Sequence, residues 1–475
     1  MDIDKQQVSK IVREVVKKIE QGTEAPVSTG SISGSSFLFD TMESAIAMAK
    51  EAQSQFANMG LELRRKVIAS MREAAKDNAE TLARLAHSES GMGRYKDKIK
   101  KNMLAAEKTP GVEDLSPVTY TGDDGMSLVE KAPFGVIGAV TPSTNPTSTV
   151  INNALSILAA GNSVVFAPHP AAKKCSQETI RVLNEAVVKA GGPGGLITAM
   201  SEPTLEGAQV LFTHRDIRVL LVTGGPAVVE KAMESNKKVI AAGPGNPPAV
   251  VDSTADIDKA VDSIIKGGSF DNGVLCTAEK EVLVTDSAAG AVIEGFRNDP
   301  RVYELNSGQM DRLADLLIEE SGKGGCEGAM NREYVGKNAS YIANAIGLNI
   351  SDDIRMLWGE VDREHDFMWT EQLMPVMPVA RTGNIEQTIE LAVKMEGGNG
   401  HTAIMHSLNV DNLTKMARKG ACSIFVKNGP SFMGLGMGEG YATMSIATPT
   451  GDGLVKASHF TRPLRCVLVD HFRIA

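Results

Sequence analysis

Apolar positions at the N-terminus form a single stripe at helical spacing. Lysine, arginine and glutamate fill the other side of the same segment. The stripe consists of Val8, Ile11, Val12, Val15, Val16 and Ile19. It predicts an amphipathic helix over residues 1–21. A helix this short is marginal alone in water and gains stability when it docks on another surface.

A stretch rich in glycine, serine, threonine and proline follows over residues 22–36 and indicates a flexible linker. A tethered amphipathic helix is typical of a recognition segment that lays its apolar face on a partner. The alternative is a helix that packs on its own domain or on a neighbouring subunit, but the linker argues against tight docking. A membrane-surface helix is disfavoured, because the polar side is mixed in charge and no Trp or Phe anchors it.

From residue 37 to 108 the apolar period is helical, for example over 42–56 and 61–85, and strand-like segments follow over 118–131. Beyond these segments, the spacing of apolar residues alternates between that of strands and that of helices. Buried strands are indicated at 134–142, 163–170, 195–200, 217–225 and 237–243, and helices at 147–160, 173–190 and 226–235. Such alternation predicts a largely parallel, doubly wound sheet, in which ligands bind outside the carboxyl ends of the strands.

A second alternating block runs from about residue 249 to 426. It contains strand-like segments at 280–286, 355–361 and 422–428, and the tail over 465–474 is typical of a final strand or hairpin arm. The chain as a whole is therefore predicted to be an α/β protein with more than one domain.

Charge and cysteine content narrow the function. The 475 residues carry a net charge of -9, and such an acidic surface disfavours nucleic acid and anionic membranes as partners. We expect no signal peptide and no membrane span, since no apolar run is long enough. Five scattered cysteines without a CxxC pair favour a reducing cytosol and disfavour disulfides or a metal site.

Three places along the chain are candidates for chemistry. Cys276 follows the loop FDNG and precedes a strand, which suits a nucleophile, although a buried, inert cysteine is the alternative. Asn145 lies where a strand gives way to a helix and is suited to an oxyanion, although it can also cap the helix ahead of Pro146. No GxGxxG is present, and Thr223-Gly224-Gly225 offers a helix N-terminus to a pyrophosphate or forms a simple turn.

Longer segments carry a family resemblance over nearly the whole chain from about Phe37 onward. Among them are SGMGRYKDKIKKN, APFGVIGAVTPSTNPTSTV, LLVTGGPAVVE, GPGNPPAVVDSTADI, KGGSFDN, MEGGNGHTAIMHS and RCVLVDHFRI. The chain resembles the aldehyde dehydrogenase superfamily. More narrowly, it is similar to the coenzyme A (CoA)-acylating branch of bacterial microcompartments, which includes acetaldehyde and propionaldehyde dehydrogenases of ethanolamine and propanediol utilisation.

The resemblance implies catalytic roles. Cys276 matches the nucleophile, and Asn145 with the Cys276 backbone N–H matches the oxyanion site. His401, in MEGGNGHTAIMHS, would assist CoA deprotonation or tune Cys276, or it would only order its loop.

Cofactor contacts are implied in the same way. Glu371 matches the glutamate that binds the nicotinamide ribose, although an exposed carboxylate ahead of a strand is the alternative. The resemblance also assigns two backbone segments to the NAD groove, namely Thr141-Pro142-Ser143 and Thr223-Gly224-Gly225.

Departures from the wider superfamily are informative. Hydrolytic members carry a glutamate base where this chain has Ala241-Ala242-Gly243-Pro244-Gly245, so the thioester should await a thiol such as CoA. The usual lysine after the second strand is absent, and His169 is expected to take part of the adenosine ribose contact, which leaves NAD versus NADP open. Acetaldehyde and propanal both stay open as substrates, since one methylene discriminates by only about 1–3 kcal/mol.

The implied architecture is an aldehyde dehydrogenase fold with a Rossmann-like cofactor domain, an α/β catalytic domain and a small β oligomerisation arm. We expect the NAD-binding domain over 37–245, with 118–131 in the arm, the catalytic domain over 246–445, and the return to the cofactor domain and the arm over 446–475. The resemblance further implies a dimer or tetramer inside a cytoplasmic microcompartment, with the 1–21 helix on a shell protein. The alternatives are a hydrolytic aldehyde dehydrogenase and a non-catalytic cargo protein.

Overall fold

The computed structural model describes residues 37–325 and 328–474. The helix predicted over 1–21 and the linker predicted over 22–36 lie outside the described residues, as does Cys326. Within the described ranges, no helix is both long and apolar enough to cross a membrane.

The first of two large parallel sheets has six strands in the order β1-β6-β5-β4-β7-β8. Its strands are β1 (Leu38–Phe39), β4 (Val136–Thr141), β5 (Ser163–Pro168), β6 (Ile197–Met200), β7 (Ile217–Thr223) and β8 (Lys238–Ala242). The chain steps outward from β4 to β6 and then returns to place β7 on the other side of β4. The predicted doubly wound sheet is confirmed, and its switch point lies between β4 and β7.

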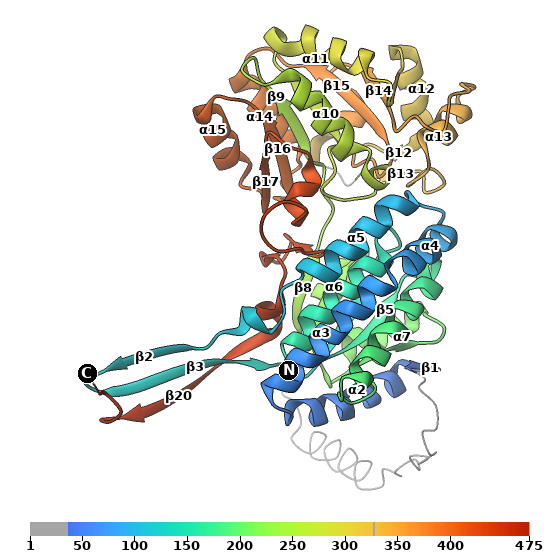
Figure 1. Ribbon diagram of the computed structural model, residues 1–475. Helices are drawn as coiled ribbons and strands as arrows, with labels where there is room; N and C mark the ends of the chain where they lie inside the picture. The colour runs from blue at the N-terminus through green and yellow to red at the C-terminus, as the bar shows by residue number, and fades with distance from the viewer. Residues whose placement is uncertain (1–36, 326–327, 475) are drawn as a thin grey trace, which may run out of the picture. The chain divides into compact units, whose positions relative to one another are not determined.

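Helices cover both faces of this sheet (Figure 1). One face carries α3 (Leu61–Asp77), α4 (Ala79–Ser90), α5 (Tyr95–Lys108), α6 (Pro146–Ala159) and α7 (Lys173–Lys189). The other carries α2 (Met42–Ala57), α8 (Leu205–Thr213) and α9 (Pro226–Met233). Every residue of α6 is buried, so the start of this helix is a fixed point of the fold.

One local prediction in this region was wrong, and one helix was missed. The continuous helical period over 61–85 is divided into α3 and α4 at Asn78, whose side chain binds the carbonyl of Ala74. Asparagine competes for backbone hydrogen bonds in this way and is a poor interior helix residue. Helix α8 was not predicted at all.

A second parallel sheet of seven strands has the order β11-β14-β15-β10-β9-β16-β17. Its strands are β9 (Pro248–Val251), β10 (Glu281–Val284), β11 (Val302–Glu304), β14 (Met356–Glu360), β15 (Val376–Arg381), β16 (Thr402–His406) and β17 (Ile424–Lys427). Helices α10 (Ile257–Gly268) and α11 (Asp286–Asn298) pack on one face, and α14 (Ile385–Met395) and α15 (Val410–Gly420) on the other. Helices α12 (Ser307–Leu317) and α13 (Ala339–Ala345) surround a further cluster at the β14 side.

The remaining strands are antiparallel. The last strand, β20 (Thr461–Val469), lies beside β3 (Gly125–Pro133), which also pairs with β2 (Val118–Gly122) (Figure 1). Two short pairs, β12 (Ile318–Glu320) with β13 (Ala329–Met330) and β18 (Ile446–Ala447) with β19 (Gly453–Leu454), complete the fold. The domain boundaries given above stay predictions.

Candidate active site

Cys276 lies on the connection between the 3₁₀ turn η3 (Phe270–Gly273) and strand β10, and its side chain is half-buried. The turn is strained, because Asp271 and Asn272 adopt left-handed conformations with φ of 49° and 57°. Such conformations cost about 1–3 kcal/mol each in a residue other than glycine, and they gather at functional sites. The loop before Cys276 is therefore held in place by its surroundings.

Charges of both signs surround the Cys276 thiol. Burial and, to a smaller extent, the Glu371 carboxylate raise the pKa of the thiol to about 12, although Lys280 and Lys101 act in the opposite direction. Lys280 is 1% exposed, and its ammonium donates a 2.6 Å hydrogen bond to the carbonyl of Gly273. The thiol is thus protonated at neutral pH in the absence of substrate.

Gly245 brings three of the predicted site residues together. Its N–H donates to Oε1 of Glu371 at 3.4 Å. A Cβ atom at position 245 would lie 2.7 Å from the Cys276 carbonyl oxygen and 2.9 Å from Cγ of His401. Cys276, Glu371 and His401 therefore meet around this glycine, and the packing leaves no room there for a side chain, least of all a glutamate.

His401 is fully buried. Its Nδ1 lies 2.8 Å from Oγ1 of Thr402, and its Nε2 has no hydrogen-bond partner among the described residues. Burial, together with the charge of Lys280, lowers the pKa of the imidazole to about 4. The ring is therefore neutral at neutral pH. The loop itself is ordered by Glu396, whose carboxylate accepts the N–H groups of Gly400 and His401.

Asn145 occupies the N-cap position of α6, but its side chain makes no capping hydrogen bond. Instead, its Oδ1 accepts a 2.5 Å bond from Nζ of Lys101, and its Nδ2 donates to Oγ1 of Thr144 at 3.2 Å. The capping alternative considered from the sequence is thus not realised. The amide N–H₂ end is left available for another acceptor.

The other predicted residues lie along the carboxyl edge of the first sheet. Thr141 ends β4, Thr223 ends β7 and His169 follows β5; β4 pairs with both neighbours. Pro142 and Ser143, both half-buried, continue from Thr141. The positions that follow β4 and β7 flank the switch point, where doubly wound sheets bind ligands, and His169 lies one strand further along the same edge. Within residues 37–325 and 328–474, no hydrogen bond or ion pair joins these positions directly to Cys276.

This edge fits the pyrophosphate of a dinucleotide. Gly225 is the N-cap of α9 without a side-chain capping bond, and a Cβ atom there would meet no heavy atom within 4 Å. Gly224 faces only Val228, at 3.8 Å. The helix N-terminus is therefore open to an anion. Oγ1 of Thr141 is buried and has no partner among the described residues, so it is free to bind a polar group.

His169 and Thr223 have partners of their own. His169 is exposed, and its Nδ1 accepts the N–H of Ala171 at 3.1 Å, which fixes the ring beside the sheet edge. Partial burial of the imidazole and the charge of Arg332 lower the pKa of His169. Oγ1 of Thr223 lies 3.3 Å from Oγ of Ser445.

The sequence reasoning missed three buried charged residues close to this site: Lys101, Asp271 and Lys280. Lys101 and its neighbour Lys98 lie on the buried face of α5, and both donate to the carboxylate of Asp271 in η3. A signal exists in the sequence, because Arg94, Lys98 and Lys101 recur at helical spacing. Such a charged stripe normally faces solvent, and nothing in the pattern indicates that it is buried.

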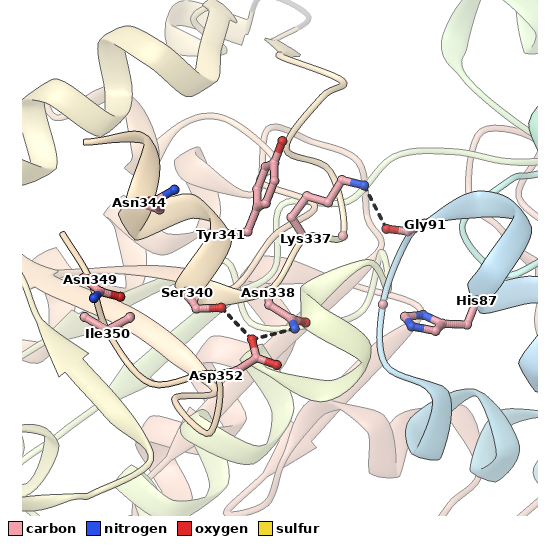
Figure 2. Close-up of a pocket in the computed structure, with 12 residues that line it drawn as sticks. His87, Gly91, Lys337, Asn338, Ser340, Tyr341, Asn344, Asn349, Ile350 and Asp352 are labelled. Atoms are coloured by element: carbon pink, nitrogen blue, oxygen red, sulfur yellow. Dashed lines mark hydrogen bonds between the residues drawn. The ribbon is translucent and has the colours of Figure 1, made fainter. Parts of the chain in front are cut away.

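A separate pocket of about 530 Å³ lies between the end of α4 and α13 (Figure 2). Asn338 and Ser340 both donate to Oδ1 of Asp352, and Lys337 donates to the carbonyl of Gly91 (Figure 2). The predicted site residues do not line it. Over 37–325 and 328–474, no group of three or more His, Cys, Asp or Glu side chains is placed to hold a metal ion.

The chain is similar in sequence and in fold to proteins of a known family. Residues 38–437 match the model of the Aldehyde dehydrogenase family. The chain is 49% identical to the acetylating acetaldehyde dehydrogenase EutE of Salmonella typhimurium over 477 aligned positions, covering 99% of this chain and 100% of the relative.

Solved structures are similar as well. One is a propionaldehyde dehydrogenase from the fucose utilisation bacterial microcompartment of Clostridium phytofermentans, with a TM-score of 0.89, 43% identity and coverage of 92% of this chain and 99% of that one. Another is the propionaldehyde dehydrogenase of Rhodopseudomonas palustris with bound CoA and an acylated cysteine, with a TM-score of 0.87, 42% identity and coverage of 91% and 98%. The predicted fold is confirmed by these matches.

Proposed function

This chain belongs to the aldehyde dehydrogenase family, and on that basis we propose that it is a CoA-acylating enzyme. It converts a short aldehyde, NAD and CoA into acyl-CoA and NADH. Acetaldehyde and propanal are the substrates that the similar proteins suggest. The acceptor of the acyl group is the part of this proposal that the site itself supports most directly.

The single observation that carries acyl transfer to CoA is the absence of a carboxylate over residues 241–245, where hydrolytic members of the superfamily carry their glutamate base. Ala241 and Ala242 end the strand β8 and are buried, and Gly245 has no room for a side chain beside the Cys276 carbonyl and His401, so this segment lacks the base for hydrolysis. A thioester formed on Cys276 is then long-lived enough to meet a thiol. This disfavours the alternative of a hydrolytic aldehyde dehydrogenase.

In the first half of the reaction, Cys276 adds to the aldehyde carbonyl and forms a thiohemiacetal. The amide N–H₂ of Asn145 and the backbone N–H of Cys276 stabilise the developing oxyanion. NAD, when bound, takes up the hydride, and a thioester remains on Cys276. The Glu371 carboxylate, held by the N–H of Gly245, orients the nicotinamide ribose.

In the second half, the CoA thiol attacks the thioester after the reduced cofactor has left, which is a ping-pong sequence. Acyl-CoA leaves, and the Cys276 thiol is restored. His401 is neutral at neutral pH, so its unpartnered Nε2 is suited to take the proton of the CoA thiol.

The cofactor lies along the carboxyl edge of the first sheet in this proposal. The open N-terminus of α9 at Gly224-Gly225 binds the pyrophosphate, with Thr223 beside it. Thr141, Pro142 and Ser143 line the groove, and His169 contacts the adenosine ribose.

Two further proposals concern assembly. We propose that the apolar stripe of residues 1–21 binds a shell protein and places the enzyme in a cytoplasmic microcompartment; the helical spacing of that stripe in the sequence supports this, as does the microcompartment origin of a similar structure. The sheet formed by β2, β3 and β20 joins copies of the chain into a dimer or tetramer.

The test is NADH formation, followed by absorbance, with acetaldehyde and with propanal, each with and without CoA. We expect sustained turnover only with CoA, and the ratio of the rates ranks the two aldehydes. Sustained turnover without CoA would mean that water resolves the thioester. The variant Cys276→Ala should lose all turnover, whereas an inert cargo protein would show none in either form.

A further inference from the structure

A buried ammonium group connects the two parts of the proposed catalytic centre. Lys101, on α5, is 2% exposed. Its Nζ donates to Oδ1 of Asn145 at 2.5 Å and also to Oδ2 of Asp271. Asn145 is the proposed oxyanion amide, and Asp271 lies in the turn that leads to Cys276. We propose that Lys101 is a positioning residue, which orients the amide of Asn145 and ties it to the nucleophile loop.

The chemistry of the three groups fixes the direction of the amide. An ammonium group has three donors and no acceptor, so it binds the oxygen end of an amide and repels the N–H₂ end. With Oδ1 held by Lys101, Nδ2 of Asn145 points the other way. There it donates only to Oγ1 of Thr144, at 3.2 Å, and its second N–H is free for an oxyanion. The reversed amide would place two donors against each other.

The second bond of Lys101 fixes the distance to the nucleophile loop. Asp271 is fully buried in a left-handed conformation, with φ of 49°. Its Oδ1 accepts the N–H of Arg94 at 2.6 Å, and its Oδ2 accepts Lys98 at 3.1 Å as well as Lys101. Gly93 is required beside it, because a Cβ atom there would lie 2.1 Å from Oδ1.

Lys101 therefore links Asn145, at the N-terminus of α6, to η3, the turn that precedes Cys276. Lys98 joins the same two segments without touching the amide, because it donates to the carbonyl of Thr144 and to Asp271. The proposed oxyanion donors lie at the first of these segments and shortly after the second. Donors of this kind accelerate a reaction only if they are held in place before charge develops. Lys101 holds one of them through a charge-assisted hydrogen bond to a neutral amide. Its role rests on the proposed function, because it acts through Asn145 and not on the substrate.

The test is a double-mutant cycle between Lys101→Met and Asn145→Ala, read as the burst of NADH formed on mixing enzyme, NAD and aldehyde. Removing one oxyanion donor typically costs about 100–1,000-fold in rate, so Asn145→Ala should lower the burst rate by that order. Lys101→Met should lower it about 10- to 100-fold with a smaller effect on the aldehyde concentration for half-saturation. In the Asn145→Ala background, Lys101→Met should change the rate by less than about threefold, since the group it orients is gone.

Lys98→Met is the matched control. It removes a donor to the same Asp271 oxygen and to the carbonyl of Thr144, but leaves the bond between Lys101 and the Asn145 side chain intact. Its effect should be the same in both backgrounds. Lys101→Met leaves Asp271 paired with Lys98, so no buried carboxylate loses its last cation, and Lys101→Gln provides a second variant if Met does not fold.

The outcomes separate this inference from the proposed function. A wild-type enzyme without a burst overturns the proposed function. A wild-type burst with equal fold losses for Lys101→Met in the two backgrounds, and likewise for Lys101→Gln, overturns the positioning role and leaves the function standing. A strongly reduced loss in the Asn145→Ala background supports both.

Discussion

At the scale of single residues, the candidate active site requires a residue without a side chain at position 245. Cys276, Glu371 and His401 converge on a position where no Cβ atom fits, so the absence of a side chain determines where the three groups lie. A displacement of about 1 Å caused by a mutation far from the reacting atoms can lower the rate of an enzyme about 100-fold. Small displacements around Gly245 should therefore lower the rate strongly.

We expect Gly245→Ala to lower the rate of CoA-dependent NADH formation by about 100-fold. The added methyl would push against the Cys276 carbonyl oxygen, 2.7 Å away, and move the nucleophile. Gly290→Ala, in an exposed turn of α11 where a Cβ atom meets nothing within 4 Å, is the control. It should keep wild-type activity and gain about 0.5–1 kcal/mol in stability. Equal activity of the two variants would contradict the packing argument.

The pH dependence of Cys276 gives a second prediction at this scale. Only the thiolate reacts with iodoacetamide, and burial raises the pKa of the thiol to about 12. The alkylation rate of the free enzyme should therefore rise about tenfold per pH unit from pH 7 to pH 10. Glu371→Gln should be alkylated faster, because the Glu371 carboxylate raises that pKa. Mass spectrometry of the Cys276 peptide follows the reaction, and a plateau below pH 9 would contradict the prediction.

Sequence reasoning identified the proposed reacting residues but not the buried charged side chains that contact them. Cys276 and Asn145 lie in motifs that resemble a known family, and their positions at strand and helix ends are local features. Lys101 and Lys280 are missed because a lysine beside a polar stretch normally faces solvent. Their burial depends on contacts between residues far apart in the chain, as between Lys101 and Asp271.

At the scale of elements, one end of α5 is clamped to η3 and to the start of β14. Asp97, on α5, is 4% exposed. Its Oδ2 accepts the side chain of Arg355 at 2.7 Å and the backbone N–H of Asp271 at 3.1 Å. Burial alone would raise the pKa of Asp97, but the hydrogen bond and charge of Arg355 outweigh it, and the pKa is lowered.

The free energy of unfolding should depend on the ionisation of the Asp97 carboxyl group. Because the folded-state pKa lies below the unfolded value of about 3.9, its contribution is complete above that pH and is lost as the pH falls through the folded pKa. Asp97→Asn should therefore lower the free energy of unfolding by about 3 kcal/mol at pH 7, a difference that persists to pH 5 and shrinks below pH 4. Urea titrations measure it, with Glu51→Gln on the exposed face of α2 as control. A deficit that does not change with pH would exclude the ion pair as its cause.

The strands and helices of the first sheet were largely predictable. Each strand predicted in the first sheet is present, because buried parallel strands appear in the sequence as apolar runs. The break between α3 and α4 was missed because the apolar period continues through Asn78. The order of the strands could not be predicted from the apolar pattern. That pattern does not show that the chain returns across the sheet and places β7 beside β4.

At the scale of the whole molecule, the β2-β3-β20 sheet pairs the tail of the chain with residues 125–133 through nine residue pairs. Yet the side chains of β20 after Thr461 are all exposed. Val467 and Val469 are 55% and 59% exposed, and Tyr120 on β2 is 61% exposed. An exposed apolar strand at a sheet edge invites pairing with another chain, which supports its proposed role as the oligomer interface.

Charges placed on this edge should separate the copies. Because alternate residues of a strand share a face, Val467→Glu with Val469→Glu puts two carboxylates on one side of β20. Burying them against a partner is unfavourable, so we expect the particle mass measured by light scattering to fall to that of a monomer. Val188→Glu, on the equally exposed surface of α7, adds a charge outside the sheet and should leave the mass unchanged. If the double variant keeps the mass of the wild type, copies of the chain do not meet through β20.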